Sequence, residues 1–256
     1  MILNRMRARF RSQDWFGVGL ELLIVVLGVF LGIQASNWNE ARIEHETGRA
    51  YRMRLDADLD ANARDLGIRA KYYRQVKSHA LAARSALQRP PGEVGERFLI
   101  DLYEASQLIP RSMKRNTWDE ILSTGAMNLV GSPEQREKIS NYYLSVETIE
   151  FTLKAVPPYR AYIRSRMPYD IQALVRARCP EQVTIDERFN VTSRLAEHCT
   201  LGLPADRAAA VAARLRADPE LEGHLNALLT DLDTKIVLTD SFRQVTGTLR
   251  QAWPKG

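Results

Sequence analysis

Residues Trp15–Ala35 read WFGVGLELLIVVLGVFLGIQA, and only Glu21 and Gln34 among them are strongly polar. At about 1.5 Å per helical residue, these 21 residues extend roughly 30 Å, the thickness of a bilayer's hydrocarbon core. We therefore predict a transmembrane helix over 15–35, a basic tail over 1–14 and a polar domain over 36–256. The lipid bilayer is accordingly an expected partner.

A cleaved signal peptide is the alternative to a retained membrane helix. Its apolar region usually spans about 7 to 15 residues and precedes a cleavage site with small residues at both specificity positions. The run here is longer, and the nearest candidate site, Ile33-Gln34-Ala35, has a bulky first residue. The sequence favours retention.

The flanking charges predict the direction of insertion, because Lys and Arg near a membrane helix tend to stay cytoplasmic. The four arginines before the helix are Arg5, Arg7, Arg9 and Arg11. The fifteen residues after it, 36–50, contain only two. We expect a protein of the inner (cytoplasmic) membrane with a cytoplasmic N-terminus and a periplasmic or extracellular domain.

Small and polar residues form one stripe on the predicted membrane helix. At about 100° per residue, Gly17, Glu21, Gly28, Gly32 and Ala35 lie within roughly 60° of one another. The spacing of the second and third glycines is GxxxG, which allows two helix backbones to approach closely. The stripe is interpreted as a homodimer seam or a docking face for a partner's membrane helix. The alternative is that glycines are simply common in membrane helices and that Glu21 reaches the headgroups.

The composition of the whole chain is that of a folded protein. Hydrophobic residues make up 45% and charged residues 26%, which argues against disorder. Of the formal net charge of +5, +3 comes from 1–14, which holds four Arg and one Asp. The charge on the domain is too diffuse for a nucleic-acid footprint, so no nucleic-acid partner is expected.

The two cysteines, Cys179 and Cys199, are close in sequence. In a translocated domain such a pair predicts a disulfide, whereas in a cytosolic domain both would be free thiols. A metal site is not expected, because only His198 lies near them.

The helical periodicity continues after the membrane segment. From Ser36 to about Gln88 the chain lacks proline, and a leucine face persists, so the membrane helix is predicted to extend into the domain. Apolar spacing and Pro and Gly positions predict further helices at 93–108, 117–124, 132–155, 159–167, 169–178, 206–218 and 220–253, with a loop between the cysteines. The last helix should pack on the first. The predicted fold is all-α, an N-terminal transmembrane helix continuing into a helical bundle.

Two segments carry signals for helix starts. Thr117-Trp118-Asp119-Glu120 fits a capping box, in which the first and fourth residues satisfy each other's backbone amides. Ser132-Pro133-Glu134-Gln135 predicts the start of the next helix, with a capping serine, a first-turn proline, an acidic residue and Gln at the third position. Gly125 is placed to end the first of these helices in the left-handed conformation.

The chain resembles an uncharacterised bacterial family of small single-pass membrane proteins, a domain of unknown function. The first similarity is Leu20–Val29 with its early glutamate, followed by Asn37-Trp38-Asn39-Glu40. The second is Thr117–Leu129 with the later pair Tyr142-Tyr143, although Ile121 stands where leucine is expected. The resemblance implies membrane anchorage and a helical domain, and no known activity.

These segments also supply the candidate binding residues. The residues considered for a pocket or docking site are Asn37, Trp38, Asn39, Thr117, Trp118, Gly125, Tyr142 and Tyr143. Interfacial anchoring of the Trp38 ring is the alternative for the first group, and capping with core packing is the alternative for the second.

Enzymatic motifs are absent from the sequence. Its four histidines are dispersed, and there is no HExxH, GxSxG or phosphate-binding glycine loop. We expect no cofactor, no metal and no catalytic residues. The favoured function is a non-catalytic scaffold or tether for an envelope partner. A ligand-sensing domain that signals through a partner membrane protein is the first alternative, and an unrecognised envelope enzyme is the second.

Overall fold

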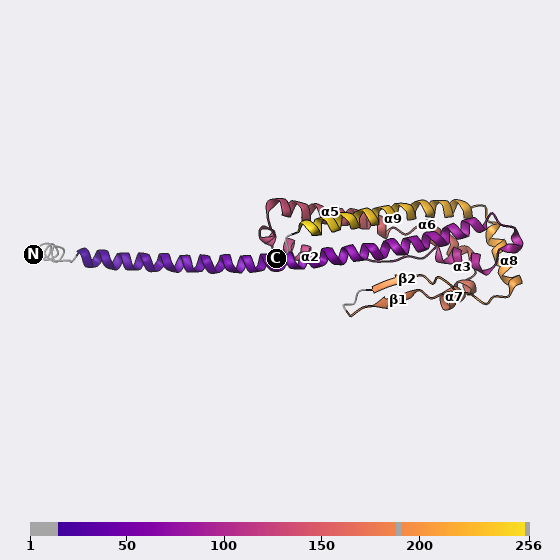
Figure 1. Cartoon of the computed structure of the whole chain (residues 1–256), viewed down its shortest axis with the longest axis horizontal. Coiled ribbons are helices and arrows are strands. Elements are labelled where there is room, and N and C mark those ends of the chain that lie inside the picture. The colour runs from indigo at the N-terminus through magenta and orange to yellow at the C-terminus, as the bar shows by residue number, and fades with distance from the viewer. Residues whose placement is uncertain (1–14, 188–190, 254–256) are drawn as a thin grey trace, which may run out of the picture.

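The computed structural model describes residues 15–187 and 191–253. Its longest element is α2 (Trp15–Ala86), a single helix of 72 residues. It runs from the apolar segment through the whole length of the domain without a break (Figure 1). The predicted continuation of the apolar N-terminal helix into the domain is therefore confirmed.

The remaining elements are short except for α5 and α9. In chain order they are η1 (Pro91–Glu93), α3 (Glu96–Glu104), α4 (Asn116–Ser123), η2 (Ala126–Leu129), α5 (Pro133–Lys154), α6 (Pro158–Arg166), α7 (Tyr169–Arg178), β1 (Gln182–Ile185), β2 (Val191–Arg194), α8 (Ala205–Arg216) and α9 (Leu221–Ala252). The fold is all-α as predicted, and the two strands form the only sheet in the described part of the chain.

Helix α9 packs antiparallel along α2 (Figure 1). Both helices contribute leucines to the core, for example Leu55 and Leu59 from α2 and Leu225 from α9, which are fully buried. Burying each such side chain stabilises the fold by about 1.5–3 kcal/mol relative to exposure. At the C-terminal end, Trp253 Nε1 donates to the carbonyl oxygen of Arg52 at 3.1 Å, which closes the domain next to the point where α2 enters it.

The shorter helices cover α2 at two places. Helix α5 lies along α9 at the end of the domain nearer the apolar segment, whereas α3, α7 and α8 gather at the far end (Figure 1). Every residue of α3 from Phe98 to Glu104 is buried.

The segment between the cysteines is a β-hairpin, so the predicted loop there is wrong. Strands β1 and β2 pair antiparallel, with Val183 opposite Ser193 and Ile185 opposite Val191. The strands are only four residues long and all of β1 is exposed, so no buried alternation marked them in the sequence. A Cys179–Cys199 disulfide joins the chain on either side of the hairpin, as predicted.

One predicted cap is confirmed and the other is wrong. Ser132 Oγ accepts from the amide of Gln135 at 3.3 Å, and the Gln135 side chain accepts from the amide of Ser132 at 2.8 Å. Thr117, in contrast, lies inside α4, whose N-cap is Arg115. Gly125 follows that helix with φ of 67°, the predicted left-handed conformation.

Candidate functional site

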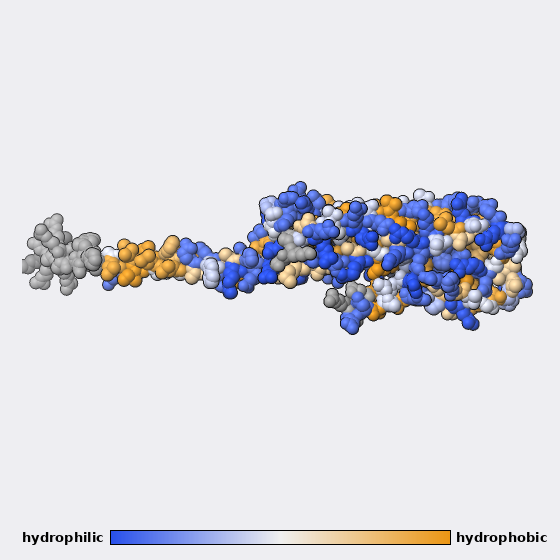
Figure 2. Space-filling model, in the orientation of Figure 1, coloured by the Kyte–Doolittle hydropathy of each residue, from blue (hydrophilic) through white to orange (hydrophobic). Residues whose placement is uncertain are grey.

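The first functional feature is the uncovered half of α2. From Gly19 to Glu46 every residue is exposed, and this is the one helix in the described residues that is long and apolar enough to cross a membrane. Figure 2 shows the apolar section as a rod that projects from a largely hydrophilic domain. Between Ala35 and Gly48, the first buried residue, α2 continues bare for about 20 Å.

The stripe residues lie on this rod without neighbours from the rest of the chain. A Cβ added at Gly28 or Gly32 would meet no atom within 4 Å among the described residues. Glu21 and Ala35 are exposed, while the surroundings of Gly17 lie outside the described side chains. The predicted seam is therefore open for another helix and stays a prediction.

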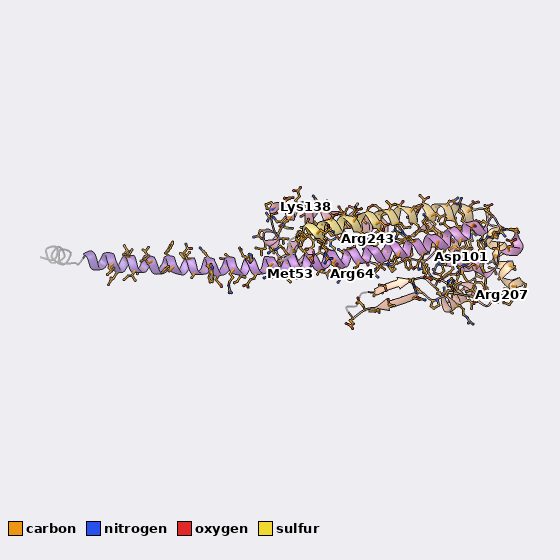
Figure 3. The ribbon with its side chains drawn as sticks, in the orientation of Figure 1. Met53, Arg64, Asp101, Lys138, Arg207 and Arg243 are labelled. Carbon is orange, nitrogen blue, oxygen red and sulfur yellow. A yellow bond between two sulfur atoms is a disulfide. The ribbon has the colours of Figure 1, made fainter. Side chains whose placement is uncertain are left out.

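The stripe and the domain lie on opposite faces of α2. At about 100° per residue, the buried face that contains Leu55, Leu59 and Leu66 is roughly 160° away from the stripe. Consistently, Met53 and Arg64, which continue the stripe direction along α2, are exposed on the side away from α9 (Figure 3). A second helix could thus approach the stripe without meeting the domain of the same chain.

The candidate residues at 37–39 lie on the exposed section of α2 between the apolar segment and the domain. Trp38 is 72% exposed, and the Asn39 side chain accepts a hydrogen bond from Arg42, three residues along the same helix, at 3.4 Å. The structure does not bring them near the second group of candidates. A docking role for Asn37, Trp38 and Asn39 remains a prediction.

The second group forms a packed aromatic cluster. The rings of Trp118 and Tyr143 stack at 5.0 Å, Tyr142 meets Tyr143 edge-on at 5.1 Å, and Tyr142 stacks on Phe242 of α9 at 5.2 Å. Thr117 is buried beside them, and its amide donates to Asp58 of α2 at 3.3 Å. Gly125 lies apart, exposed in the turn after α4.

Tyr142 also borders a groove between α5 and α9. The groove has a volume of about 640 Å³. Both polar and apolar residues line the groove: Lys138, Asn141, Tyr142, Ser145, Ser241, Gln244, Val245, Thr248, Leu249 and Ala252. Figure 3 labels Lys138 at the end of the domain nearer the rod. The size is that of a small-molecule site.

A buried ion network joins α2 to α5 and to the hairpin. Arg69 is 1% exposed and donates to Asp65 at 2.6 Å and to Glu150 of α5 at 3.2 Å. Glu150 also accepts from the amide of Met113 at 2.7 Å. Arg111 pairs with Asp65 and donates to the carbonyl oxygen of Val191 in β2. The sequence carried one signal of this network, because Arg69 continues the leucine face of α2.

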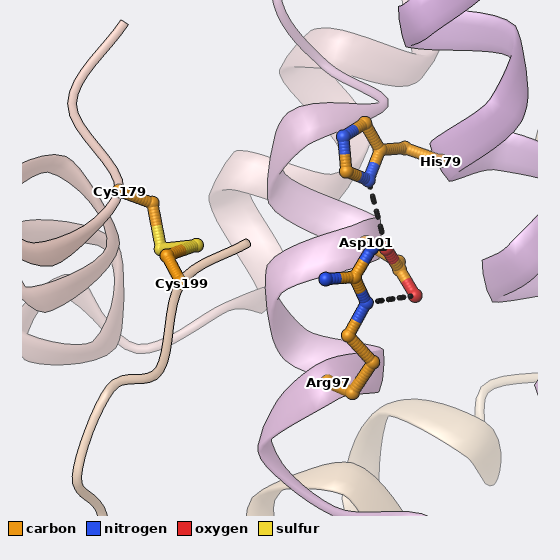
Figure 4. The surroundings of a disulfide bond; sticks show 5 residues. All are labelled: His79, Arg97, Asp101, Cys179 and Cys199. Carbon is orange, nitrogen blue, oxygen red and sulfur yellow. Dashed lines mark hydrogen bonds and ion pairs between the residues drawn. A yellow bond between two sulfur atoms is a disulfide. The ribbon is translucent and has the colours of Figure 1, made fainter. Parts of the chain in front are cut away.

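A second buried polar cluster lies on α3. His79 Nδ1 of α2 lies 2.8 Å from Asp101 Oδ1, and Arg97 also pairs with Asp101, beside the disulfide (Figure 4). One turn along, Glu104 is 1% exposed, and its Oε1 atom has no hydrogen-bond partner among the residues that the structure describes. Burial raises the pKa of Glu104 to about 7. Sequence reasoning missed this cluster, since its members are far apart in the chain.

The described residues provide no metal site. No group of three or more His, Cys, Asp or Glu side chains among them could hold an ion. The acidic residues that alternate on α2 have other partners: Asp56 and Asp60 pair with Arg250 of α9.

Comparison with known proteins identifies no relative: no protein-family model, no curated protein and no solved structure matches the chain. The resemblance to a family of single-pass membrane proteins therefore stays a prediction that rests on the residues quoted for it.

Proposed function

We propose that this protein is anchored in the inner (cytoplasmic) membrane by α2 and acts as a non-catalytic scaffold or tether for an envelope partner. The observation that carries the proposal is the continuity of α2, which joins an apolar segment of membrane-spanning length to the domain core in one helix. A disulfide within the domain supports an oxidising compartment for that domain.

The bare section of α2 supports a tethering role. A helix of about 20 Å between the bilayer and the first packed residue holds the domain at a set distance, which a flexible linker would not do. A partner that contacts the domain would be held at the same height above the membrane.

Self-association through the membrane helix belongs to the same proposal. The stripe faces away from the domain, so two copies can pair through Gly28 and Gly32 while their domains point outward. Energy transfer between two labelled populations in vesicles tests this. Gly28→Leu and Gly32→Leu should lower the transfer, whereas Val26→Leu, on the opposite face, should not. Equal transfer in all variants would contradict self-association through the stripe.

The anchoring and its direction are tested by labelling full-length protein in intact cells with a membrane-impermeant maleimide. We expect two thiols, Cys179 and Cys199, to react only after a reductant is added. Thiols that react only after cell lysis, and without a reductant, would place the domain in the cytoplasm and refute the proposal.

The groove between α5 and α9 supports a second candidate function, a domain that senses a small ligand and signals through a partner membrane protein. Its volume of about 640 Å³ suits a ligand with apolar surface that contacts Tyr142 and Val245. Such a ligand should be recovered by solvent extraction of the purified protein and detected by mass spectrometry. Its loss from a Val245→Trp variant, which fills the groove, would assign it to this place.

A further inference from the structure

Three arginines converge at the end of the domain farthest from the rod. Arg160 and Arg164 of α6 and Arg176 of α7 approach the C-terminal end of α3. Arg160 donates to the carbonyl oxygen of Ser106 at 2.5 Å, and Arg164 Nε donates to the hydroxyl of the same serine at 3.0 Å. Among the described residues, none of the three guanidinium groups forms an ion pair with a carboxylate.

Tyr103 holds two of these guanidinium groups together. The Arg164 guanidinium lies over the Tyr103 ring at 4.5 Å, and Arg176 donates to the Tyr103 hydroxyl at 3.3 Å. Burial lowers the pKa of Arg164, and the positive charges of Arg160 and Arg176 lower it further. The cluster is thus a concentration of like charge whose repulsion a bound anion would relieve.

A cleft opens next to this cluster, between the α6–α7 turn and α8. Its volume is about 820 Å³. The side chains that give it its charge are Arg164, Arg166, Arg214 and Asp218. Arg166 pairs with Asp218 at 3.3 Å, whereas neither Arg164 nor Arg214 forms an ion pair among the described residues. Arg164 Nη2 donates to the side-chain oxygen of Gln107 at 3.2 Å. Tyr169, which also lines the cleft, carries the Arg176 guanidinium over its ring at 5.4 Å.

The backbone around the cleft is fixed by a buried side chain. Gln172 Nε2 donates to the carbonyl oxygens of Arg164 and Met167, at 2.7 and 2.8 Å, which clamps the turn between α6 and α7. Arg214 donates to the carbonyl oxygen of Arg166 at 3.2 Å, which ties α8 to the same turn. The cleft is therefore held open by specific contacts, and its arginines are placed before any ligand binds.

We propose that this cleft binds a phosphate-bearing anion through Arg164 and Arg214, which both line it. The planar guanidinium group can donate two parallel hydrogen bonds to phosphate oxygens, and two such arginines in one cleft suit a diphosphate or a phosphate ester. The site goes beyond the scaffold role and does not depend on it. The phosphate belongs either to a soluble molecule or to a lipid headgroup of a facing membrane, because α7 and α8 lie at the end of the domain away from the apolar segment (Figure 1).

The test uses full-length protein in dodecyl maltoside micelles, which contain no phosphate. Inorganic phosphate and pyrophosphate are titrated calorimetrically at constant ionic strength. We expect binding of pyrophosphate that weakens about tenfold or more in Arg214→Gln and in Arg164→Gln. Arg207→Gln is the matched control, because Arg207 is an exposed arginine of the same helix α8 that pairs with Asp170. It should bind like the wild type.

A second arm separates the two sources of phosphate. Co-sedimentation with phosphatidylglycerol vesicles, compared with phosphatidylcholine vesicles, measures headgroup binding by the wild type and the same three variants. Headgroup binding that is lost in Arg214→Gln and kept in Arg207→Gln would assign the site to a lipid, and pyrophosphate binding alone would assign it to a soluble ligand. No binding in either arm, or equal weakening by Arg207→Gln, would overturn the proposal.

Discussion

Replacing Gly48 with alanine tests the point at which α2 leaves solvent and enters the domain. An alanine Cβ at this position would lie 2.5 Å from the backbone oxygen of Leu129 in η2. Ordinary contact begins near 3.4 Å, so η2 must retreat by about 0.9 Å. Overpacking of this kind costs about 1–3 kcal/mol, and the better helix propensity of alanine offsets up to about 1 kcal/mol of that cost. We therefore expect a net loss of about 1–2 kcal/mol.

Gly67 of the same helix provides the matched control. The nearest atom to a Cβ added there is Arg243 Nη1 at 3.5 Å, the end of a flexible side chain. Gly67→Ala should stabilise the domain by up to about 1 kcal/mol, since alanine restricts the unfolded chain and favours the helix. Glycine-to-alanine substitution is thus predicted to lower the free energy of unfolding at one position of α2 and to raise it at the other.

Urea unfolding of full-length protein in micelles, followed by the fluorescence of Trp118 and Trp253, measures both effects. The two variants should differ by about 2–3 kcal/mol in the free energy of unfolding. A Gly48→Ala protein as stable as Gly67→Ala would refute the close approach of η2 to α2.

Three further predictions concern the interior. Arg69→Met should cost about 3 kcal/mol of unfolding free energy in urea, because Glu150 loses a buried partner. Cys179→Ser with Cys199→Ser should lower the same quantity by about 3 kcal/mol, because the unfolded chain loses a cross-link. For Glu104, burial raises the folded-state pKa from 4.5 to about 7. Its contribution to stability is therefore complete below pH 4.5 and falls as pH rises through 7, by up to roughly 3 kcal/mol, whereas Glu104→Gln should flatten this dependence in thermal unfolding.

Each of these predictions has its own control. Arg69→Met combined with Glu150→Gln should cost less than the sum of the two single changes, and additive costs would contradict the pairing. A reductant should lower the unfolding midpoint of the wild type and leave the double serine variant unchanged. A Glu104→Gln protein with the same pH dependence as the wild type would show that another group titrates.

The long helices could be predicted from the sequence because their signals are local and repeated. Helix α2 lacks proline and keeps a leucine face, and the cap at Ser132 needs only the side chain of Gln135, three residues away. The same pattern at Thr117 does not form a capping box, because one of its residues has a partner in another helix. Glu120 pairs with Arg54 of α2, so it is not available to the helix start.

The candidate site residues were predictable only in part, because contacts between distant segments leave little trace in one sequence. The stripe on the apolar part of α2 is visible from spacing alone. The groove between α5 and α9 and the arginine cleft depend on how separate helices pack. Arg164 and Arg214 lie 50 residues apart, and no periodic pattern connects them.

One unbroken helix, α2, joins the apolar segment to the domain. Asn39 and Ala57 are exposed residues of α2 on the same helical face, 18 residues apart. Spin labels at Asn39→Cys and Ala57→Cys, in full-length protein reconstituted in vesicles, report the distance between them by pulsed electron resonance. We predict a single narrow distribution near 27 Å, the length of about 18 helical residues, extended only by the label arms. A broad distribution, or one centred well below that length, would show that the rod bends or unfolds between membrane and domain and would contradict the account.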